Sequence, residues 1–381
     1  MTVKELIARS KAAQAEFAFA TQEQADAAAR AICKVVYDNA EKLGPMAAEE
    51  SRMGSEQDKI AKCRNKSALI WESLKDKKSC DIINRIEERR MIEVAKPVGV
   101  VASIIPSTNP VVTPMSNGAF ALKCRNSVIF APHPRAVKCT KLLVEMFRAE
   151  LKKLGLPEDL VLGLEEVSND LTSELMSAAD MVVATGGMGM VKAAYSSGKP
   201  AIGVGQGNVQ CIIDEDADIA DAVGKIIIGR AFDNGLICLG EQTVFVPEDK
   251  EAEFVAEMKK QGGYLVEGEE NVDKLREGLF PGGGAFSRVV VGMFADQVSD
   301  EIGLGAPKGT RVLFAKAKAL GAGDVLCREK LCPVIAYMTY KTFKEGVAMM
   351  EANLEHEGKG HSIAVHSNTP ENVEYAAIRC C

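Results

Sequence analysis

The sequence predicts an α/β protein of two domains, the first of them a Rossmann-type nucleotide-binding domain. Three observations predict this class. The chain has 381 residues, which is too long for a single compact core. From Met91 onward, short β-branched runs alternate with amphipathic helical segments, as in parallel sheets that need helical crossovers. The runs are apolar throughout, which indicates strands buried on both faces.

The composition narrows the possible functions. Hydrophobic residues make up 47% of the chain and charged residues 26%, as in ordinary globular proteins, so we expect no long disordered region. The net charge of -7 argues against a nucleic-acid partner, because that function requires a concentrated basic surface. The first residues mix charged and apolar side chains and no long apolar stretch follows, so we expect neither a signal peptide nor a membrane partner.

The cysteines point to a reducing environment. Their number, eleven, is odd, and they are scattered from Cys33 to Cys381 without the short paired spacings of disulfide frameworks or zinc sites. We therefore expect reduced thiols, a cytoplasmic protein and no bound metal.

The first predicted domain spans residues 1–228. Apolar side chains at helical spacing cover 2–43 and stop at Gly44 and Pro45, and a second helical pattern covers 46–78. The strands of one parallel sheet are then predicted over 98–105, 126–132, 180–187 and 209–214, with a helix over 136–154.

The second predicted domain spans residues 229–366, followed by a return segment over 367–381. Its predicted strands cover 242–247, 288–292, 311–315, 333–340 and 362–367, and its predicted helices cover 250–261 and 342–353. Glycine-rich stretches between these segments mark loops.

The stretch AFDNGLICLGEQ, 231–242, places Cys238 in a tight turn before a predicted strand. A cysteine is nucleophilic as its thiolate, which needs backbone N–H groups, a helix N-terminus or a cation beside it. Asn234 and Gly235 form a turn that would hold the sulfur at a loop tip. An isolated cysteine is otherwise most often a buried packing residue, and this stretch alone favours that alternative.

Of two glycine-dense loops, ATGGMGM directly follows a predicted strand and IGVGQGN lies between predicted strands. Their residues of interest are Thr185, Gly186, Gly187, Gly203, Val204 and Gly205. Glycines at a strand end let the backbone approach a phosphate. ATGGMGM is not the full G-x-G-x-x-G fingerprint, so a turn that only packs is an equal alternative there. Together the loops favour an extended ligand across them.

Two polar loops also follow predicted strands. The rigid loop PSTNP carries Ser107, Thr108 and Asn109, whose hydroxyl and amide groups could donate to a developing oxyanion. An Asn-Pro turn explains these residues equally well. The loop APHPRA contributes His133, Pro134 and Arg135. These three stand beyond a strand end, where open α/β sheets contact ligands.

Seven stretches occur together along the chain: PSTNP, APHPRA, ATGG, GVGQGN, FDNGLICLGEQTV, REKLCPV and GKGHSIAVHS. In this order and approximate spacing they resemble the CoA-acylating aldehyde dehydrogenases, a branch of the aldehyde dehydrogenase superfamily, over nearly the whole chain. The stretches KVVYDNAE, IAKC, KDKK and AAYSSGKP make the likeness strongest to the CoA-dependent succinate-semialdehyde dehydrogenases. The resemblance implies an aldehyde dehydrogenase-like fold, in which an α/β catalytic domain follows the Rossmann-type domain.

The resemblance also implies a reaction. Cys238 would attack the aldehyde to form a thiohemiacetal, a hydride would pass to NAD or NADP, and the acyl thioester left on the sulfur would be transferred to CoA. Hydrolytic relatives hold a glutamate base at the position that matches Gly203. A glycine there favours acyl transfer over hydrolysis, because general-base help is worth about 10²–10⁴ in rate, and it leaves room for CoA.

Further roles follow from the same resemblance. The oxyanion donor of hydrolytic relatives aligns with Thr108, with Asn109 one residue later, so both are candidates. Glu329 matches a residue that holds the nicotinamide ribose, and Leu331 matches an apolar residue near it. His361 matches a histidine typical of the acylating branch, at the acyl or CoA site. The other expected cofactor contacts are Ser107, His133, Pro134, Arg135, Thr185, Gly186, Gly187, Val204 and Gly205.

The choice between the two cofactors depends on one position. Relatives selective for NAD often place a glutamate three residues beyond the position of His133, where this chain has Ala136. With Arg135 and Lys138 close by, we expect a 2′-phosphate to meet no fixed anion and to gain charge-assisted contacts. NADP is therefore expected to be accepted, with NAD as the alternative.

Two alternatives stay open. The same chemistry could act on sulfoacetaldehyde, propionaldehyde or acetaldehyde. The chain could also be a nucleotide-binding module without turnover, since relatives continue past the point that matches Cys381, with a segment that closes the catalytic domain and pairs with a neighbouring subunit. With that segment we expect a homo-oligomer, either a dimer or a tetramer.

Overall fold

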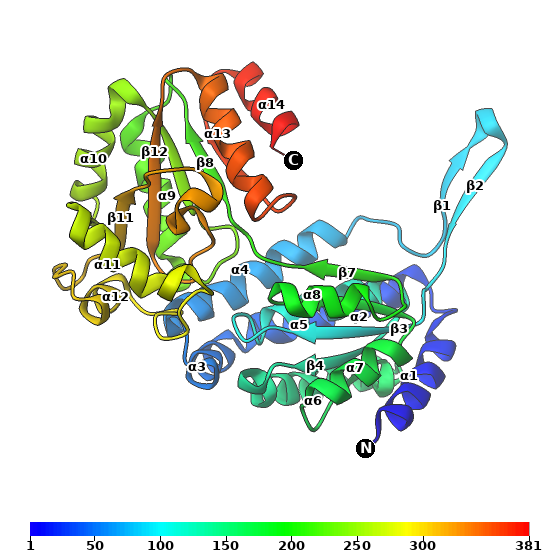
Figure 1. Cartoon of the computed structure of the whole chain (residues 1–381). Coiled ribbons are helices and arrows are strands. Elements are labelled where there is room, and N and C mark those ends of the chain that lie inside the picture. Colours follow the sequence, from blue (N-terminus) through cyan, green and yellow to red (C-terminus); the bar gives the residue numbers. More distant parts are fainter. Residues whose placement is uncertain (381) are drawn as a thin grey trace. The chain divides into compact units, whose positions relative to one another are not determined.

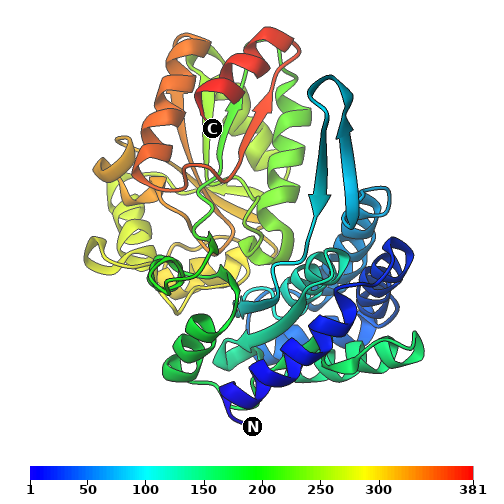
Figure 2. The ribbon, with the colours of Figure 1, turned by 90° about the vertical axis from the view of Figure 1, so that its right-hand side faces the viewer.

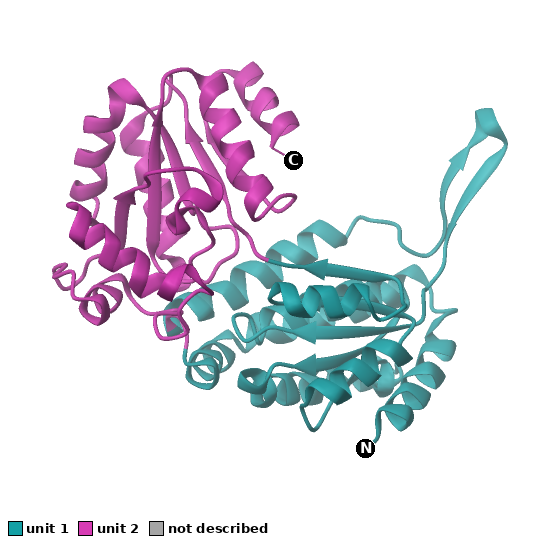
Figure 3. Cartoon of the chain, in the orientation of Figure 1, with its two compact units in different colours: residues 1–52, 56–205 teal, residues 53–55, 206–381 magenta. Residues whose placement is uncertain are grey.

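The apolar runs of the sequence form two separate parallel sheets, each covered by helices (Figures 1 and 3). The computed structural model describes residues 1–380. The first of its two compact units comprises Met1–Arg52 and Glu56–Gly205, and the second comprises Met53–Ser55 and the chain from Gln206 onward. The expected domain boundary near residue 229 lies within a helix of the second unit, so the compact units divide earlier in the chain.

The Rossmann-type prediction for the first unit is confirmed, because β3 to β7 form a parallel sheet in the order β5-β4-β3-β6-β7. The strands are β1 (Asp81–Ile86), β2 (Met91–Ala95), β3 (Val100–Ile105), β4 (Ser127–Pro132), β5 (Val161–Gly163), β6 (Met181–Thr185) and β7 (Ala201–Val204). The helices are α1 (Val3–Phe17), α2 (Gln22–Asp38), α3 (Ala40–Ser51), α4 (Glu56–Leu74), α5 (Val112–Lys123), α6 (Val137–Lys153), α7 (Asn169–Ala178) and α8 (Met188–Tyr195).

Helices cover both faces of this sheet. Val101 of β3 pairs with Val128 of β4 and Met181 of β6, and every residue of β3 and β4 is buried. One core packs the sheet against α2, α5 and α6, and the other packs it against α7, α8 and the start of α1. The strand order changes direction between β3 and β6, and such a switch point opens a ligand crevice at the carboxyl ends of the strands.

The helical pattern at the N-terminus is confirmed, but its expected stop is wrong. Gly44 and Pro45 lie inside α3, which ends instead at Arg52 in the left-handed conformation, with φ of 58°. A Cβ atom on Gly44 would lie 2.6 Å from Cγ1 of Ile60 in α4. The glycine therefore allows two helices to pack closely and does not terminate one.

The strands β1 and β2 form an antiparallel hairpin that projects from the first unit (Figures 1 and 2) and that the sequence pattern did not predict. Nearly all of its residues are exposed, so it has no buried face with a regular apolar period. A lone two-stranded hairpin is marginally stable in water.

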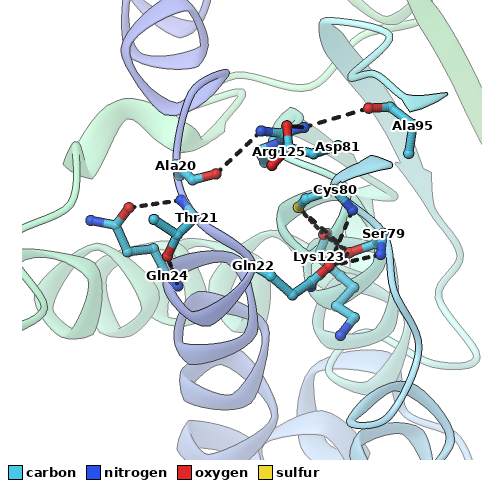
Figure 4. A network of polar contacts seen from close by, with 10 residues as sticks. All are labelled: Ala20, Thr21, Gln22, Gln24, Ser79, Cys80, Asp81, Ala95, Lys123 and Arg125. Carbon is cyan, nitrogen blue, oxygen red and sulfur yellow. Dashed lines mark hydrogen bonds and ion pairs between the residues drawn. The ribbon is translucent and has the colours of Figure 1, made fainter. Parts of the chain in front are cut away.

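Polar contacts tie the root of this hairpin to α2 and to the end of α5 (Figure 4). The side-chain oxygen Oε1 of Gln22 accepts hydrogen bonds from the backbone N–H groups of Ser79 (2.8 Å) and Cys80 (3.1 Å). Buried Arg125 donates to the carbonyl of Ala20 (3.2 Å) and to the carboxylate of Asp81 (3.1 Å). These contacts fix the point where the two strands leave the unit.

The second unit contains a sheet in the order β10-β11-β12-β9-β8-β13, in which all neighbours are parallel. The strands are β8 (Gln210–Ile213), β9 (Thr243–Pro247), β10 (Gly263–Leu265), β11 (Val312–Lys316), β12 (Val334–Tyr340) and β13 (Ile363–His366). The helices are α9 (Ile219–Ala231), α10 (Glu251–Lys260), α11 (Glu269–Leu279), α12 (Ala295–Ile302), α13 (Phe343–His356) and α14 (Pro370–Arg379). Helices α9 and α10 cover one face, and the other four helices pack on the opposite face.

Two sequence expectations for this unit are corrected. The strand over 209–214 belongs to the second sheet, because β8 pairs with β9 and β13. The strand expected over 288–292 is wrong, because Gly292 turns the chain at φ of 68° and its carbonyl accepts from Gly54 N–H, outside any sheet. The return segment expected over 367–381 includes α14, and Cys381 lies outside the described residues.

A search of residues 1–380 for a helix of sufficient length and apolarity to cross a membrane finds none.

Candidate active site

The cofactor residues expected in the first unit lie at one edge of its sheet. Because β3, β4, β6 and β7 are parallel, the loops after them leave the same edge. The loops carry Ser107, Thr108, Asn109, His133, Pro134, Arg135, Gly186, Gly187 and Gly205, and Thr185 and Val204 are the last residues of β6 and β7. The N–H of Gly186 donates to the carbonyl of Val204 (3.1 Å), so the two glycine-dense loops are adjacent. The switch point between β3 and β6 opens at this edge, where nucleotides bind in related sheets.

Two buried lysines of α4 support the PSTNP loop. Lys62, 5% exposed, donates from Nζ to Oδ1 of Asn109 at 2.9 Å. Lys59, 3% exposed, donates to the backbone carbonyl of Thr108 at 3.3 Å. Ser107, Thr108 and Asn109 themselves are half-buried. The sequence analysis missed both lysines, because a lysine in an amphipathic helix resembles a solvated one until the packing is known.

The space beside Gly203 is occupied by a tyrosine. The N–H of Gly203 donates to Oη of Tyr195 at 3.1 Å. A Cβ atom at position 203 would lie 2.7 Å from Cγ1 of Val191 and 2.9 Å from the Tyr195 ring, closer than side-chain atoms approach. A glutamate at this position therefore requires the tyrosine to move. Packing thus favours glycine at position 203, in addition to the chemical reason.

The expectation that no fixed anion stands near Ala136 is wrong. The carboxylate of Glu50, from α3, accepts hydrogen bonds from the N–H groups of Lys138 (2.6 Å) and Cys139 (2.8 Å) in the first turn of α6. The charge comes from a helix far away in the sequence, so no local motif could reveal it.

The residues expected in the second unit lie at the amino ends of its strands, whereas those of the first unit lie at the carboxyl ends. Cys238 precedes β9, Glu329 and Leu331 precede β12, and His361 precedes β13. Gly207, which the sequence analysis did not single out, precedes β8 at the same edge. These strands are parallel neighbours or near neighbours in the sheet. Four segments that are far apart in the sequence therefore meet around Cys238.

The turn before Cys238 has an unusual backbone. Asp233, Asn234 and Gly235 all have positive φ, at 49°, 52° and 73°. A Cβ atom on Gly235 would lie 2.5 Å from the backbone of Cys332, so only glycine fits. The amide of Asn234 donates to the carbonyl of Gly292 at 2.9 Å. Strained residues of this kind persist only where surrounding contacts hold them, and they are frequent at active sites.

Cys238 is exposed, so the alternative of a packed core thiol is wrong. Its backbone lies close to His361 across Gly207: a Cβ atom on Gly207 would lie 2.7 Å from the carbonyl oxygen of Cys238 and 3.0 Å from Nε2 of His361. Nδ1 of His361 contacts the hydroxyl of Ser362 at 3.1 Å. Nε2 therefore faces the turn, and burial lowers the pKa of His361, which favours the neutral imidazole.

Glu329 lies on the same side of Gly207. Its Oε1 accepts the Gly207 N–H at 2.9 Å, and burial raises the pKa of its carboxyl group although this hydrogen bond opposes the rise. The backbone N–H of Glu329 donates to the carboxylate of Glu357 at 2.8 Å. Leu331, two residues further on, accepts the N–H of Gly292 at 2.8 Å.

A layer of buried charged groups lies behind the turn and was not expected from the sequence. Arg230 is fully buried and donates to the carbonyls of Lys330, Cys332 and Val334. Burial lowers the pKa of Lys330 to about 7, with the charge of Arg230 as a second cause. Burial also raises the pKa of Glu241, three residues after Cys238. Within residues 1–380, no group of three or more acidic, histidine or cysteine side chains is placed to hold a metal ion.

Comparisons with known proteins identify the family of this chain. The aldehyde dehydrogenase family model matches residues 1–274. The succinate-semialdehyde dehydrogenase (acetylating) of Clostridium kluyveri is 47% identical over 99% of this chain and 83% of that protein. The acetylating aldehyde dehydrogenase of Geobacillus thermoglucosidasius has a similar structure, with a TM-score of 0.93 and 36% identity over 99% of this chain and 83% of that one.

A third similar structure is that of Rhodopseudomonas palustris propionaldehyde dehydrogenase with bound CoA and an acylated cysteine. It has a TM-score of 0.86 and 27% identity, over 99% of this chain and 85% of that one. The resemblance stated from the sequence motifs is therefore confirmed. The chain belongs to the aldehyde dehydrogenase family, in its acylating branch.

Proposed function

We propose that this enzyme converts an aldehyde, CoA and NAD(P)⁺ into an acyl-CoA and NAD(P)H, with Cys238 as the nucleophile. The observation that carries this proposal is the turn that holds the exposed Cys238 beside His361 at the amino edge of the second sheet. The side chains at the carboxyl edge of the first sheet fit a nicotinamide dinucleotide, which would serve as the hydride acceptor.

In the proposed first half-reaction, the Cys238 thiolate adds to the aldehyde carbon and forms a thiohemiacetal. The side-chain amide of Asn109 donates to the oxygen, which carries the developing negative charge. Loss of the hydride, with its electron pair, from the carbon re-forms the carbonyl and leaves an acyl thioester on Cys238. Glu329 would hold the ribose of the acceptor, and Leu331 would pack near it.

In the proposed second half-reaction, the thiol of CoA attacks the acyl thioester. Nε2 of His361 accepts the thiol proton, and the Cys238 thiolate is the leaving group, so the sulfur returns to its starting state. Water competes poorly, because Gly203 offers no carboxylate base and Tyr195 fills the adjacent space. The same steps in reverse reduce an acyl-CoA to the aldehyde.

Succinate semialdehyde is the proposed substrate. The relative from Clostridium kluyveri, named for this substrate, shares 47% of its residues with this chain. The test is the kcat/KM for succinate semialdehyde, sulfoacetaldehyde, propionaldehyde and acetaldehyde with CoA present. The proposal predicts the highest value for succinate semialdehyde and no oxidation without CoA. A preference for propionaldehyde would contradict the substrate, and CoA-independent formation of free acid would contradict the reaction.

We also propose that the enzyme works in the cytoplasm as a homo-oligomer, assembled through the β1–β2 hairpin. Five apolar side chains of the hairpin are 37% to 52% exposed: Ile82, Ile83, Met91, Ile92 and Val94. Exposed apolar surface of this kind marks an interaction site. Light scattering should show a mass above that of one chain for the wild type and a lower mass for Ile92→Lys. A wild-type monomer would contradict the assembly.

The second candidate function is a nucleotide-binding module without turnover. The variant Cys238→Ala separates the two functions. An enzyme loses all NAD(P)H formation and keeps cofactor binding, whereas a binding module behaves as before in both assays.

A further inference from the structure

The start of α6 carries a carboxylate from another helix. Ala136 stands at the N-cap and has no side chain that could accept a hydrogen bond. Glu50 of α3 takes this role, because its two carboxylate oxygens accept from the N–H groups of Lys138 (2.6 Å) and Cys139 (2.8 Å). These donors belong to the first turn, whose unpaired N–H groups attract anions.

The topology of the sheet also predicts that the adenosine ribose of a dinucleotide binds at this helix start. Helix α6 follows β4, the second strand of the sheet in chain order and the neighbour of the central β3. In Rossmann-type sheets, an acidic side chain roughly 20 residues beyond the first βα turn holds the ribose 2′-hydroxyl. The end of β4 lies at about that separation from the loop after β3.

We propose that Glu50 selects NAD over NADP. The inference rests on the proposed function, in which the first unit binds a nicotinamide dinucleotide at this edge. Of the roughly four acceptor sites on the Glu50 carboxylate, the N–H groups of Lys138 and Cys139 and the Cys139 thiol use three, and one remains for a ribose hydroxyl. A 2′-phosphate would meet the fixed negative charge of Glu50, and it would find both N–H groups already bonded.

The exposed cations near this site do not outweigh the carboxylate. Arg135 and Lys138 are exposed, and screened charge pairs between long exposed side chains contribute little. Burial lowers the pKa of His133, so its imidazole adds no positive charge at neutral pH. Glu50 is half-buried and held by two short hydrogen bonds.

The test is calorimetric titration of NAD and NADP into the wild type, Glu50→Gln and Glu49→Gln. Glu49 is the matched control, because it precedes Glu50 in α3 and is exposed. We expect the wild type to bind NAD at least about tenfold more tightly than NADP, which is the order of one unfavourable charge contact. Glu50→Gln should reduce this ratio to about one, and Glu49→Gln should leave it unchanged.

An unchanged ratio in Glu50→Gln, with or without a lower Tm, would overturn the proposal and leave Glu50 as a helix cap. Equal binding of NAD and NADP by the wild type would also overturn it. ADP-ribose and its 2′-phosphorylated form, titrated into the wild type, give the same comparison if the variant does not fold. A wild type that binds neither dinucleotide would instead show that the proposed function is wrong. The proposal about Glu50 would then be wrong as well.

Discussion

Nζ of Lys62 donates a hydrogen bond of 2.9 Å to Oδ1 of Asn109. Because an ammonium group can only donate, this contact fixes which side of the amide carries the oxygen. The Nδ2 group then faces away from Lys62 and contacts Oγ1 of Thr108 at 3.4 Å, near the long limit for a hydrogen bond. An amide nitrogen held in this way suits an oxyanion donor, so the geometry favours Asn109 over Thr108 for that role.

The first prediction concerns this pair. Asn109→Ala should slow acylation of Cys238 by about 10²-fold, as for the loss of one oxyanion donor. Lys62→Met should slow it by about tenfold, because the amide loses its fixed orientation. In the Asn109→Ala background, Lys62→Met should have little further effect, which single-turnover acylation rates would measure.

Lys59→Met is the matched control for this double-mutant cycle of Lys62 and Asn109. Lys59 is equally buried on the same helix, but it donates to the backbone carbonyl of Thr108 and not to the amide. Its effect should therefore add to that of Asn109→Ala. If the effects of Lys62→Met and Asn109→Ala also add, Lys62 does not act through Asn109.

The second prediction concerns position 203, where hydrolytic relatives hold a glutamate base and this chain has a glycine. Gly203→Glu should lower the Tm and should not produce free acid, because the side chain would clash with Tyr195 and Val191. The double variant Gly203→Glu with Tyr195→Ala removes the ring and should release some free acid. Chromatography of the products, acid against acyl-CoA, measures the partition. A stable single variant that hydrolyses the thioester would show that Tyr195 does not block this position.

The third prediction concerns pH. Burial lowers the pKa of His361, so the imidazole is neutral above about pH 6.5 and able to accept a proton. Transfer of the acyl group from pre-acylated enzyme to CoA should therefore be constant at neutral pH and fall only below pH 6.5. In His361→Asn the rate should instead rise about tenfold per pH unit up to the pKa of a thiol, about 8.5. Identical profiles for both proteins would rule out His361 as the base.

The fourth prediction concerns the buried layer behind the turn. Arg230→Met removes the guanidinium hydrogen bonds to three buried carbonyl groups, so the free energy of unfolding should fall by about 3–5 kcal/mol. Cys332, one of these partners, also supports Gly235 and hence the Cys238 turn. Lys225→Met, an exposed change on the same helix, should alter stability by less than about 0.5 kcal/mol. Urea unfolding of both variants measures the difference, and similar midpoints would contradict a structural role for Arg230.

Much of the fold could be predicted from the sequence, because its parallel strands are continuous apolar runs. The strands β3 and β4 are buried throughout, β12 is mostly buried and β6 is buried at alternate residues, and all four were found in this way. The exposed β1–β2 hairpin has no such run and was missed. The three-residue edge strand β10 gave no signal either, because it is too short for a recognisable period.

The candidate site could likewise be predicted from the sequence only in part. The turn motif around Cys238 pointed to that residue, and the family resemblance supplied Glu329 and His361, because all three stand in short stretches directly before strands. Lys62 and Glu50 could not be found in this way. Each acts on a loop or helix that is distant in the sequence, so its role depends on packing that no local pattern records.

The central claim is that the sulfur of Cys238 carries the acyl group between the two half-reactions. Mass spectrometry of the protein incubated with an acyl-CoA and no reduced cofactor tests this claim most directly. The account predicts a peptide containing Cys238 that is heavier by the mass of the acyl group, and no such peptide in Cys238→Ser. An unmodified Cys238 under conditions that support turnover would contradict the account.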